Sequence, residues 1–150
     1  MINQTKNPDQ FSGNIKKSEV TLALDLGKRR VGVALSHGII AEAQKTILLN
    51  ESKPEEFFPK LKKITEEQKV KKIIVGLPLG KNLQETKQSV WTRDFASKIE
   101  RELRLPIEFV EESFSSTSAL EDLKKGKRFK KEEIDAQSAK IILEQYLNSK

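Results

Sequence analysis

Carboxylates at three separate places along the chain are the side chains best suited to chemistry. Asp25 comes just before the turn that begins at Gly27, Glu111 and Glu112 end a short apolar run, and Asp135 opens a run with helical spacing. If one carboxylate from each place converges, the three cannot all stay ionised without a cation. Hard divalent ions take oxygen ligands, and two of them about 3.5–4 Å apart clamp the attacking and leaving oxygens of a phosphodiester. The pattern therefore indicates phosphodiester hydrolysis.

Asp25 lies at the end of a strand expected at 20–26, on the face that carries the small side chains Thr21 and Ala23. A buried strand rarely carries a charge unless that charge is paired or binds a metal. The alternative is an aspartate that caps the turn by accepting hydrogen bonds from the next backbone amides. The local pattern leaves both interpretations open.

The other candidate carboxylates lie at the end of an expected strand and near the start of an expected helix. Glu111 and Glu112 lie where a strand expected at 107–111 ends, and ligands of open α/β sheets sit at the carboxyl ends of strands. Adjacent residues point to opposite faces, so at most one of the two faces a site. Asp135 begins a stripe that continues through Ala139 and Ile142 and so faces inward. A position at a helix N-terminus, favoured by the helix dipole, is the alternative for Asp135.

The elements that must position these residues form a mixed α/β fold. Strands are expected at about 20–26, 29–36, 41–48, 72–76 and 107–111, and helices at about 55–68, 84–104, 115–125 and 132–148. The first three strands can form an antiparallel meander, and the last two need crossover helices and so run parallel. We expect one five-stranded sheet with helices on both faces. Trp91 shares a helical stripe with Phe95 and is expected in the core, and His37, without a spaced partner, is expected to be structural or on the surface.

The length of the chain, 150 residues, and its composition favour a single globular domain. Residues 1–18 are polar and without periodicity, so we expect a disordered tail there and the domain at 19–150. The absence of cysteine excludes a thiol nucleophile, a disulfide framework and a cysteine-based zinc site. No signal pattern or membrane-length apolar run is present, and we expect a cytoplasmic protein.

Positive charge is concentrated in residues 124–131, which hold six of the 28 basic residues, against a net charge of +6. A focused basic cluster indicates contact with a polyanion, most simply nucleic acid phosphate. On this basis Lys125, Lys127 and Arg128 are candidate nucleic-acid contacts. The alternative is an ordinary solvated loop.

Four motifs together resemble the YqgF-type family, which has an RNase H-like fold and is associated with pre-16S rRNA processing and Holliday junction resolution. They lie at 24–34, 74–79, 110–116 and 134–139, and the resemblance covers about 20–148. It implies three catalytic carboxylates that also bind the metal, Asp25, Glu112 and Asp135, with Mg²⁺ or Mn²⁺, two ions, as cofactor.

The resemblance also assigns supporting roles. Arg30 matches an arginine suited to a phosphate contact, and Ser115 and Ser116 stand where the family has two threonines. The chain departs from the family pattern at Glu111, where an aspartate is usual, at Ser113, where an arginine is usual, and in the stretch 81–84.

The resemblance predicts a metal-dependent nuclease that processes the pre-16S rRNA 5′ end, with structured nucleic acid as partner, no membrane, and a monomer or homodimer. The alternatives are a Holliday junction resolvase, which should be dimeric to cut two symmetric strands, and a non-catalytic nucleic-acid-binding module. The strand–turn–strand around Asp25 also resembles the phosphate-binding hairpin of sugar kinases and actin-like ATPases. Those proteins need a second lobe of similar size, so this fourth possibility is disfavoured.

Overall fold

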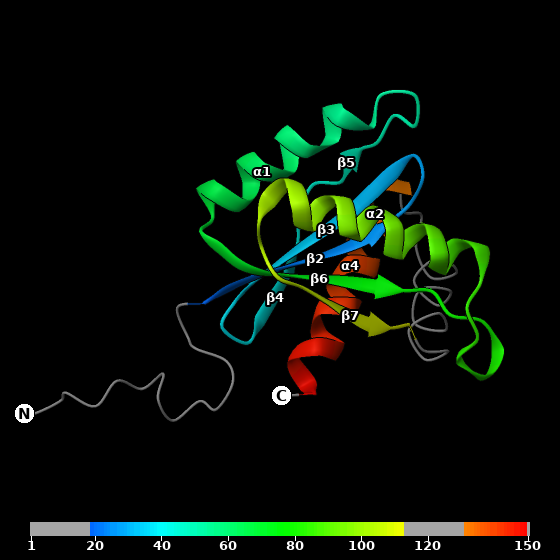
Figure 1. The fold of residues 1–150 in the computed structure, drawn as a ribbon. Helices are drawn as coiled ribbons and strands as arrows, with labels where there is room; N and C mark the ends of the chain where they lie inside the picture. The colour runs from blue at the N-terminus through cyan, green and yellow to red at the C-terminus, as the bar shows by residue number, and fades with distance from the viewer. Residues whose placement is uncertain (1–18, 113–130, 150) are drawn as a thin grey trace, which may run out of the picture.

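The computed structural model describes residues 19–112 and 131–149, and the expected tail and the helix at 115–125 lie outside them. The strands are β2 (Val20–Leu26), β3 (Arg30–His37), β4 (Ile40–Ala43), β5 (Ile47–Leu48), β6 (Val70–Leu77) and β7 (Ile107–Glu111) (Figure 1). The helices are α1 (Phe57–Glu67), α2 (Lys87–Leu103) and α4 (Lys131–Asn148), with short 3₁₀ turns η2 (Pro54–Glu56) and η3 (Lys81–Leu83). Pro54 stands at the start of the turn that leads into α1, where its missing amide hydrogen costs nothing.

The strands form one mixed sheet in the order β4-β3-β2-β6-β7, with β5 also paired to β3. Strands β2, β3 and β4 are antiparallel, whereas β6 is parallel to β2 and β7 is parallel to β6. The expected mixed α/β sheet is therefore confirmed. Its parallel half places the ends of β6 and β7 at the same edge as the end of β2.

The strand expected at 41–48 is wrong in detail, because the structure divides it into β4 and β5 and the sheet has six strands rather than five. The break falls at residues 44–46. There the Thr46 hydroxyl donates a hydrogen bond to the backbone oxygen of Glu132 in α4 at 2.6 Å. The chain thus leaves the ladder where the first turn of α4 lies, and it rejoins β3 opposite Arg30 and Val31.

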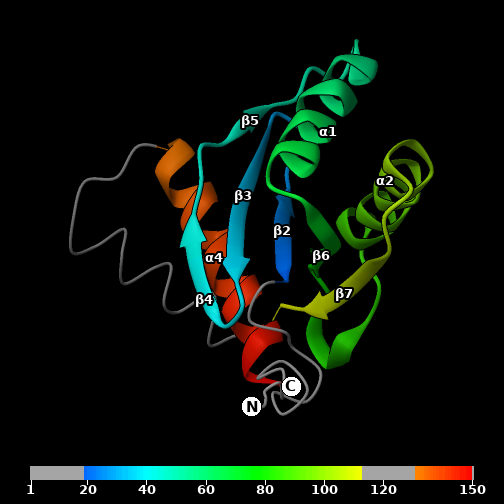
Figure 2. The same ribbon diagram turned by 90° about the vertical axis from the view of Figure 1, so that its left-hand side faces the viewer.

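Helices cover both faces of the sheet, as expected: α1 and α2 lie on one side and α4 on the other (Figure 2). Large side chains of β2 such as Leu22 and Leu24 pack under α1 and α2, while Ala23 belongs to a second core cluster with α4. Trp91 stacks on Phe95 with ring centroids 5.3 Å apart, which places it in the first cluster rather than on a free binding surface.

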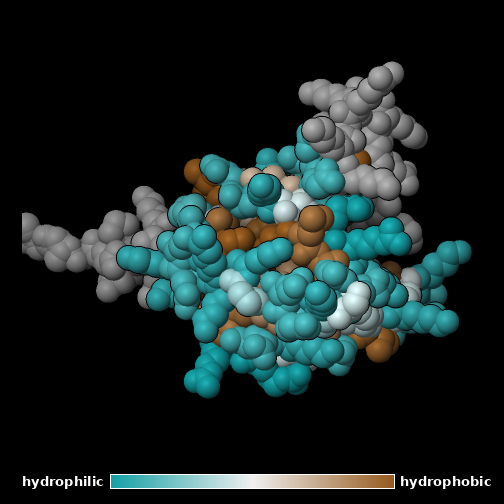
Figure 3. Space-filling model, turned by 90° about the horizontal axis from the view of Figure 1, so that it is seen from above, coloured by the Kyte–Doolittle hydropathy of each residue, from teal (hydrophilic) through white to brown (hydrophobic). Residues whose placement is uncertain are grey.

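The small side chains on the α4 face let this helix approach the sheet closely. Ala23, Ala34 and Ala139 are fully buried between the two layers. The outer face of α1 and α2 is mainly hydrophilic, with apolar surface between the two helices (Figure 3). None of the helices in the described part of the chain is both long enough and apolar enough to span a membrane.

Candidate active site

Asp25 is the second-to-last residue of β2, and its side chain lies on the face of the sheet that α4 covers. It pairs across the hairpin with Gly32 of β3. The turn itself is closed by the backbone, because the Gly27 amide donates to the Arg30 carbonyl oxygen at 3.0 Å. The Asp25 carboxylate is therefore not needed to close the turn, and it interacts with Glu112, Asp135 and Ser138 from other elements. This favours the functional interpretation over the turn cap.

Glu112 extends the parallel ladder by one residue beyond β7. Its amide donates to the Leu77 carbonyl oxygen at 3.1 Å. Gly76 on β6 mainly makes room for α4, because a Cβ built on Gly76 would overlap the Ile142 side chain; the Glu112 carboxylate oxygen would lie 3.0 Å from the same Cβ. Glu111 is exposed. Of the two adjacent glutamates, Glu112 is therefore the one that faces inward.

Asp135 reaches the same region from the first turns of α4. A Cβ on Gly32 would overlap the Asp135 carbonyl oxygen, so the glycine allows the helix backbone to rest on β3. The stripe predicted from the sequence is confirmed, since Ala139 and Ile142 are buried against the sheet. Arg30 Nε donates a hydrogen bond to Asp135 Oδ2 at 2.8 Å and forms an ion pair with it.

Asp25 is the carboxylate that its surroundings affect most. Burial, followed by the charges of Glu112 and Asp135, raises the pKa of Asp25 from 3.8 to about 7. A hydrogen bond with the Ser138 side chain acts in the opposite direction on that pKa. Burial also raises the pKa of Glu112. Clustered carboxylates with disfavoured negative charge are a typical arrangement at functional sites.

The donor set suits a hard divalent cation, because all three side chains offer carboxylate oxygens. A cation would also offset both the burial and the neighbouring negative charges that raise the pKa of Asp25. Within residues 19–112 and 131–149, no group of three or more acidic, histidine or cysteine side chains has an arrangement that could already hold a metal ion. Asp135 is held by Arg30 in this arrangement.

The remaining predicted site residues divide into two groups. Arg30 is at the site, where it contacts Asp135. Ser115, Ser116, Lys125, Lys127 and Arg128 lie outside the described residues. His37 is exposed at the end of β3, consistent with the surface role expected for it.

Sequence reasoning missed Ser138, Gly32 and Gly76 as parts of the site. The signal for Ser138 was its spacing, because residues three apart on a helix lie on one face and Ser138 follows Asp135 by three. The two glycines carried no such signal, since their roles depend on which residues of α4 lie across from them.

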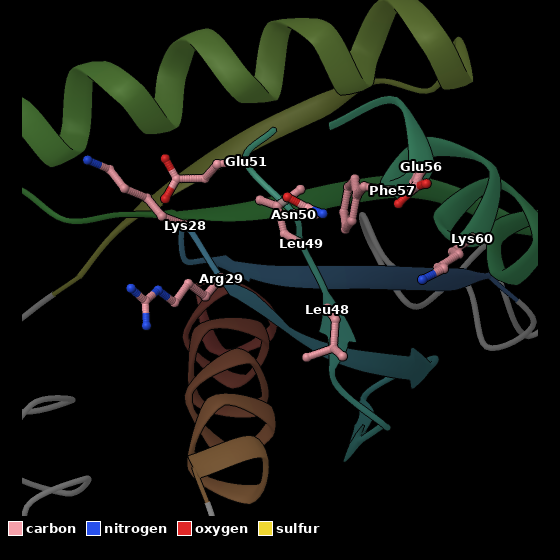
Figure 4. Close-up of a pocket in the computed structure, with 9 residues that line it drawn as sticks. All are labelled: Lys28, Arg29, Leu48, Leu49, Asn50, Glu51, Glu56, Phe57 and Lys60. Carbon is pink, nitrogen blue, oxygen red and sulfur yellow. The ribbon is translucent and has the colours of Figure 1, made fainter. Parts of the chain in front are cut away.

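A pocket of about 550 Å³ opens beside the same turn, between the β2–β3 hairpin, β5 and the start of α1 (Figure 4). Lys28 and Arg29 extend from the turn at one end, and Glu56 and Lys60 lie at the other. None of the three carboxylates lines this pocket. It belongs to the surroundings of the hairpin rather than to the acidic cluster.

The sheet order and the helices that cover both faces define an RNase H-like α/β fold. The fold is shared with RuvC of Thermus thermophilus, solved in complex with a Holliday junction substrate. That likeness has a TM-score of 0.53 at 10% identity and covers 87% of this chain and 94% of RuvC.

Sequence comparison gives the family. The family described as "RuvX: Holliday junction resolvase" matches residues 19–149. A "Putative pre-16S rRNA nuclease" of Maridesulfovibrio salexigens is 36% identical over 129 residues, covering 84% of this chain and 96% of the relative. One with the same name from Gloeothece citriformis is 34% identical over 139 residues, covering 91% and 92%. The chain therefore belongs to the RuvX family, and the resemblance inferred from its four motifs is confirmed.

Proposed function

We propose that this protein is a metal-dependent nuclease that hydrolyses phosphodiester bonds in structured nucleic acid. The observation that carries the proposal is the position of three carboxylates at the end of β2, just after β7 and in α4, where burial and then the charges of Glu112 and Asp135 raise the pKa of Asp25 to about 7. A bound cation would offset the negative charge of these carboxylates. The family and the names of its relatives agree with this chemistry.

Asp25, Glu112 and Asp135 are the residues proposed to hold Mg²⁺ or Mn²⁺, in a site for two ions. When bound, the metal supplies Lewis-acid stabilisation of the phosphoryl oxygens and acidifies a water molecule. The chain's own contribution is positional. The end of β2, the residue after β7 and the first turns of α4 carry the three carboxylates, and Gly32 and Gly76 let α4 approach the sheet closely.

The substrate proposed first is precursor 16S rRNA, cut near its 5′ end during ribosome biogenesis. Support comes from the names of the relatives and from the basic segment at 124–131, suited to a phosphate backbone. A four-way DNA junction is the second candidate, supported by the description of the family. Both are bound through backbone shape, so the site residues alone do not separate them.

The test is cleavage of a precursor 16S rRNA fragment and of a four-way DNA junction by purified protein with Mg²⁺ or Mn²⁺. Asp25→Asn and Glu112→Gln should each lower the rate by about two orders of magnitude or more, because each removes a charged oxygen ligand. Glu111→Gln is the matched control, since Glu111 is the exposed neighbour of Glu112. Wild-type rates in Asp25→Asn would refute the proposed site.

The same assay separates the non-catalytic alternative. A binding module would retain nucleic acid with a steep dependence on salt and would leave it uncut under both ions. Preferred cutting of the junction by a dimer would favour the resolvase over rRNA processing.

A further inference from the structure

The ion pair between Arg30 and Asp135 involves one of the carboxylates proposed to bind the metal, so it can affect metal binding. We propose that the Arg30 guanidinium competes with the divalent cation for Asp135, so that transfer of Arg30 to a substrate phosphate raises the affinity of the site for the cation. This inference rests on the proposed function and concerns the regulation of that same site.

The geometry allows the guanidinium to change partners while the backbone stays in place. Arg30 is held at the start of β3 by the hairpin bond from Gly27 and by pairing with Leu48 of β5. Its side chain is 29% exposed and that of Asp135 is 25% exposed, so the pair is shielded but reachable from outside. Nε is the donor to Asp135, and the guanidinium has further N–H donors that can meet a phosphate.

Charge gives the reason for the competition. A guanidinium 2.8 Å from Oδ2 occupies one oxygen of Asp135 and places a positive charge where a cation would bind. In the metal-free protein this same charge offsets the repulsion among three carboxylates.

A phosphodiester offers Arg30 a suitable replacement partner. Arginine binds phosphate through parallel N–H bonds, with a geometry as favourable as its pairing with a carboxylate. When the phosphate takes the guanidinium, Asp135 loses its competitor. By thermodynamic linkage, nucleic acid and cation then raise each other's affinity by the same factor. The affinity of the site for the cation would therefore stay low until the substrate binds.

The test is a titration of metal-free protein with Mn²⁺ alone, read by the electron paramagnetic resonance signal of free Mn²⁺. Arg30→Gln should bind Mn²⁺ on the order of tenfold more tightly than the wild type, because a positive charge next to a ligand oxygen is removed. Arg30→Lys keeps the charge and should bind within about twofold of the wild type. Arg29→Gln removes the same charge from the exposed neighbouring position and should also stay within about twofold.

A second arm tests the link to substrate with a phosphorothioate RNA hairpin that resists cleavage. The hairpin should raise the Mn²⁺ affinity of the wild type more than that of Arg30→Gln. If Arg30→Gln does not fold, Arg30→Met retains the aliphatic stem and takes its place.

The outcomes are distinguishable from those of the proposed function. Mn²⁺ affinity that is unchanged or weaker in Arg30→Gln overturns this inference and leaves the nuclease proposal standing if the wild type still binds the ion and cuts. A wild type that neither binds Mn²⁺ nor cleaves overturns both.

Discussion

Gly32 and Asp135 are in backbone contact: a Cβ added to Gly32 would overlap the Asp135 carbonyl oxygen. Gly32 is also the residue paired with Asp25 across the hairpin. One glycine therefore fixes how closely the carboxylate of β2 and the carboxylate of α4 approach each other. The acidic cluster depends on this contact between sheet and helix as much as on the acids themselves.

Gly32→Ala should destabilise the protein and impair the site together. The added methyl group meets backbone rather than a flexible side chain, so α4 must shift, at a typical cost of about 1–3 kcal/mol in the free energy of unfolding. Urea denaturation measures the stability, and Mn²⁺ titration measures the site. Gly80→Ala is the control, because its new Cβ would lie 3.1 Å from a terminal methyl of Thr86. Equal stability of the two variants would contradict the contact.

Stability in the absence of metal should fall as the pH rises from about 4 to 7 through the contribution of Asp25. Its pKa is raised from 3.8 to about 7, so the folded state holds a proton in this range that the unfolded state has released. The unfolded state is favoured as that proton is lost, and above about pH 7 the contribution levels off.

Asp25→Asn should remove this pH dependence. In EDTA, the variant should become more stable relative to the wild type by about 1–3 kcal/mol between about pH 4 and pH 8. Urea denaturation of both proteins at each pH gives the difference. A difference that does not change with pH would show that Asp25 titrates normally.

Mn²⁺ affinity should increase with pH, because the cation and the proton compete for Asp25. With a pKa of about 7 for this carboxyl, the affinity should rise about tenfold between about pH 6 and pH 8. Titration calorimetry in two buffers of different ionisation enthalpy would count the proton released. Binding without proton release in this range would contradict the raised pKa.

Trp91→Leu should lower stability without weakening nucleic acid binding. Trp91 stacks on Phe95 at 5.3 Å and packs against the core cluster beneath α2. Loss of this packing should cost roughly 1–3 kcal/mol in the free energy of unfolding. Chemical denaturation and RNA filter binding measure the two properties separately. A large loss of RNA affinity at unchanged stability would instead indicate a base-stacking role.

Local patterns were enough to predict the elements that carry the acids. The alternation around Asp25 predicted a strand at 20–26, and β2 has these bounds. The helical spacing after Asp135 predicted the buried face of α4. Both patterns involve only residues that are close in sequence, and therefore these elements could be predicted without knowledge of the tertiary structure.

Long-range contacts account for what could not be predicted. The strand expected at 41–48 breaks where Thr46 meets Glu132 of α4, a partner 86 residues away. Arg30 and Asp135 are 105 residues apart, and no local pattern identifies them as an ion pair. The choice of Glu112 over Glu111 came from family resemblance, and the burial agrees with it, because Glu111 is exposed and Glu112 is half-buried.

The central claim is that Asp25, Glu112 and Asp135 form one metal site. Anomalous diffraction from a crystal soaked in Mn²⁺ tests it most directly. The account predicts an anomalous peak bounded by these three carboxylates, weaker or absent in Asp25→Asn and unchanged in Glu111→Gln. A well-ordered crystal with no peak among the three carboxylates, or with Mn²⁺ bound only elsewhere, would contradict it.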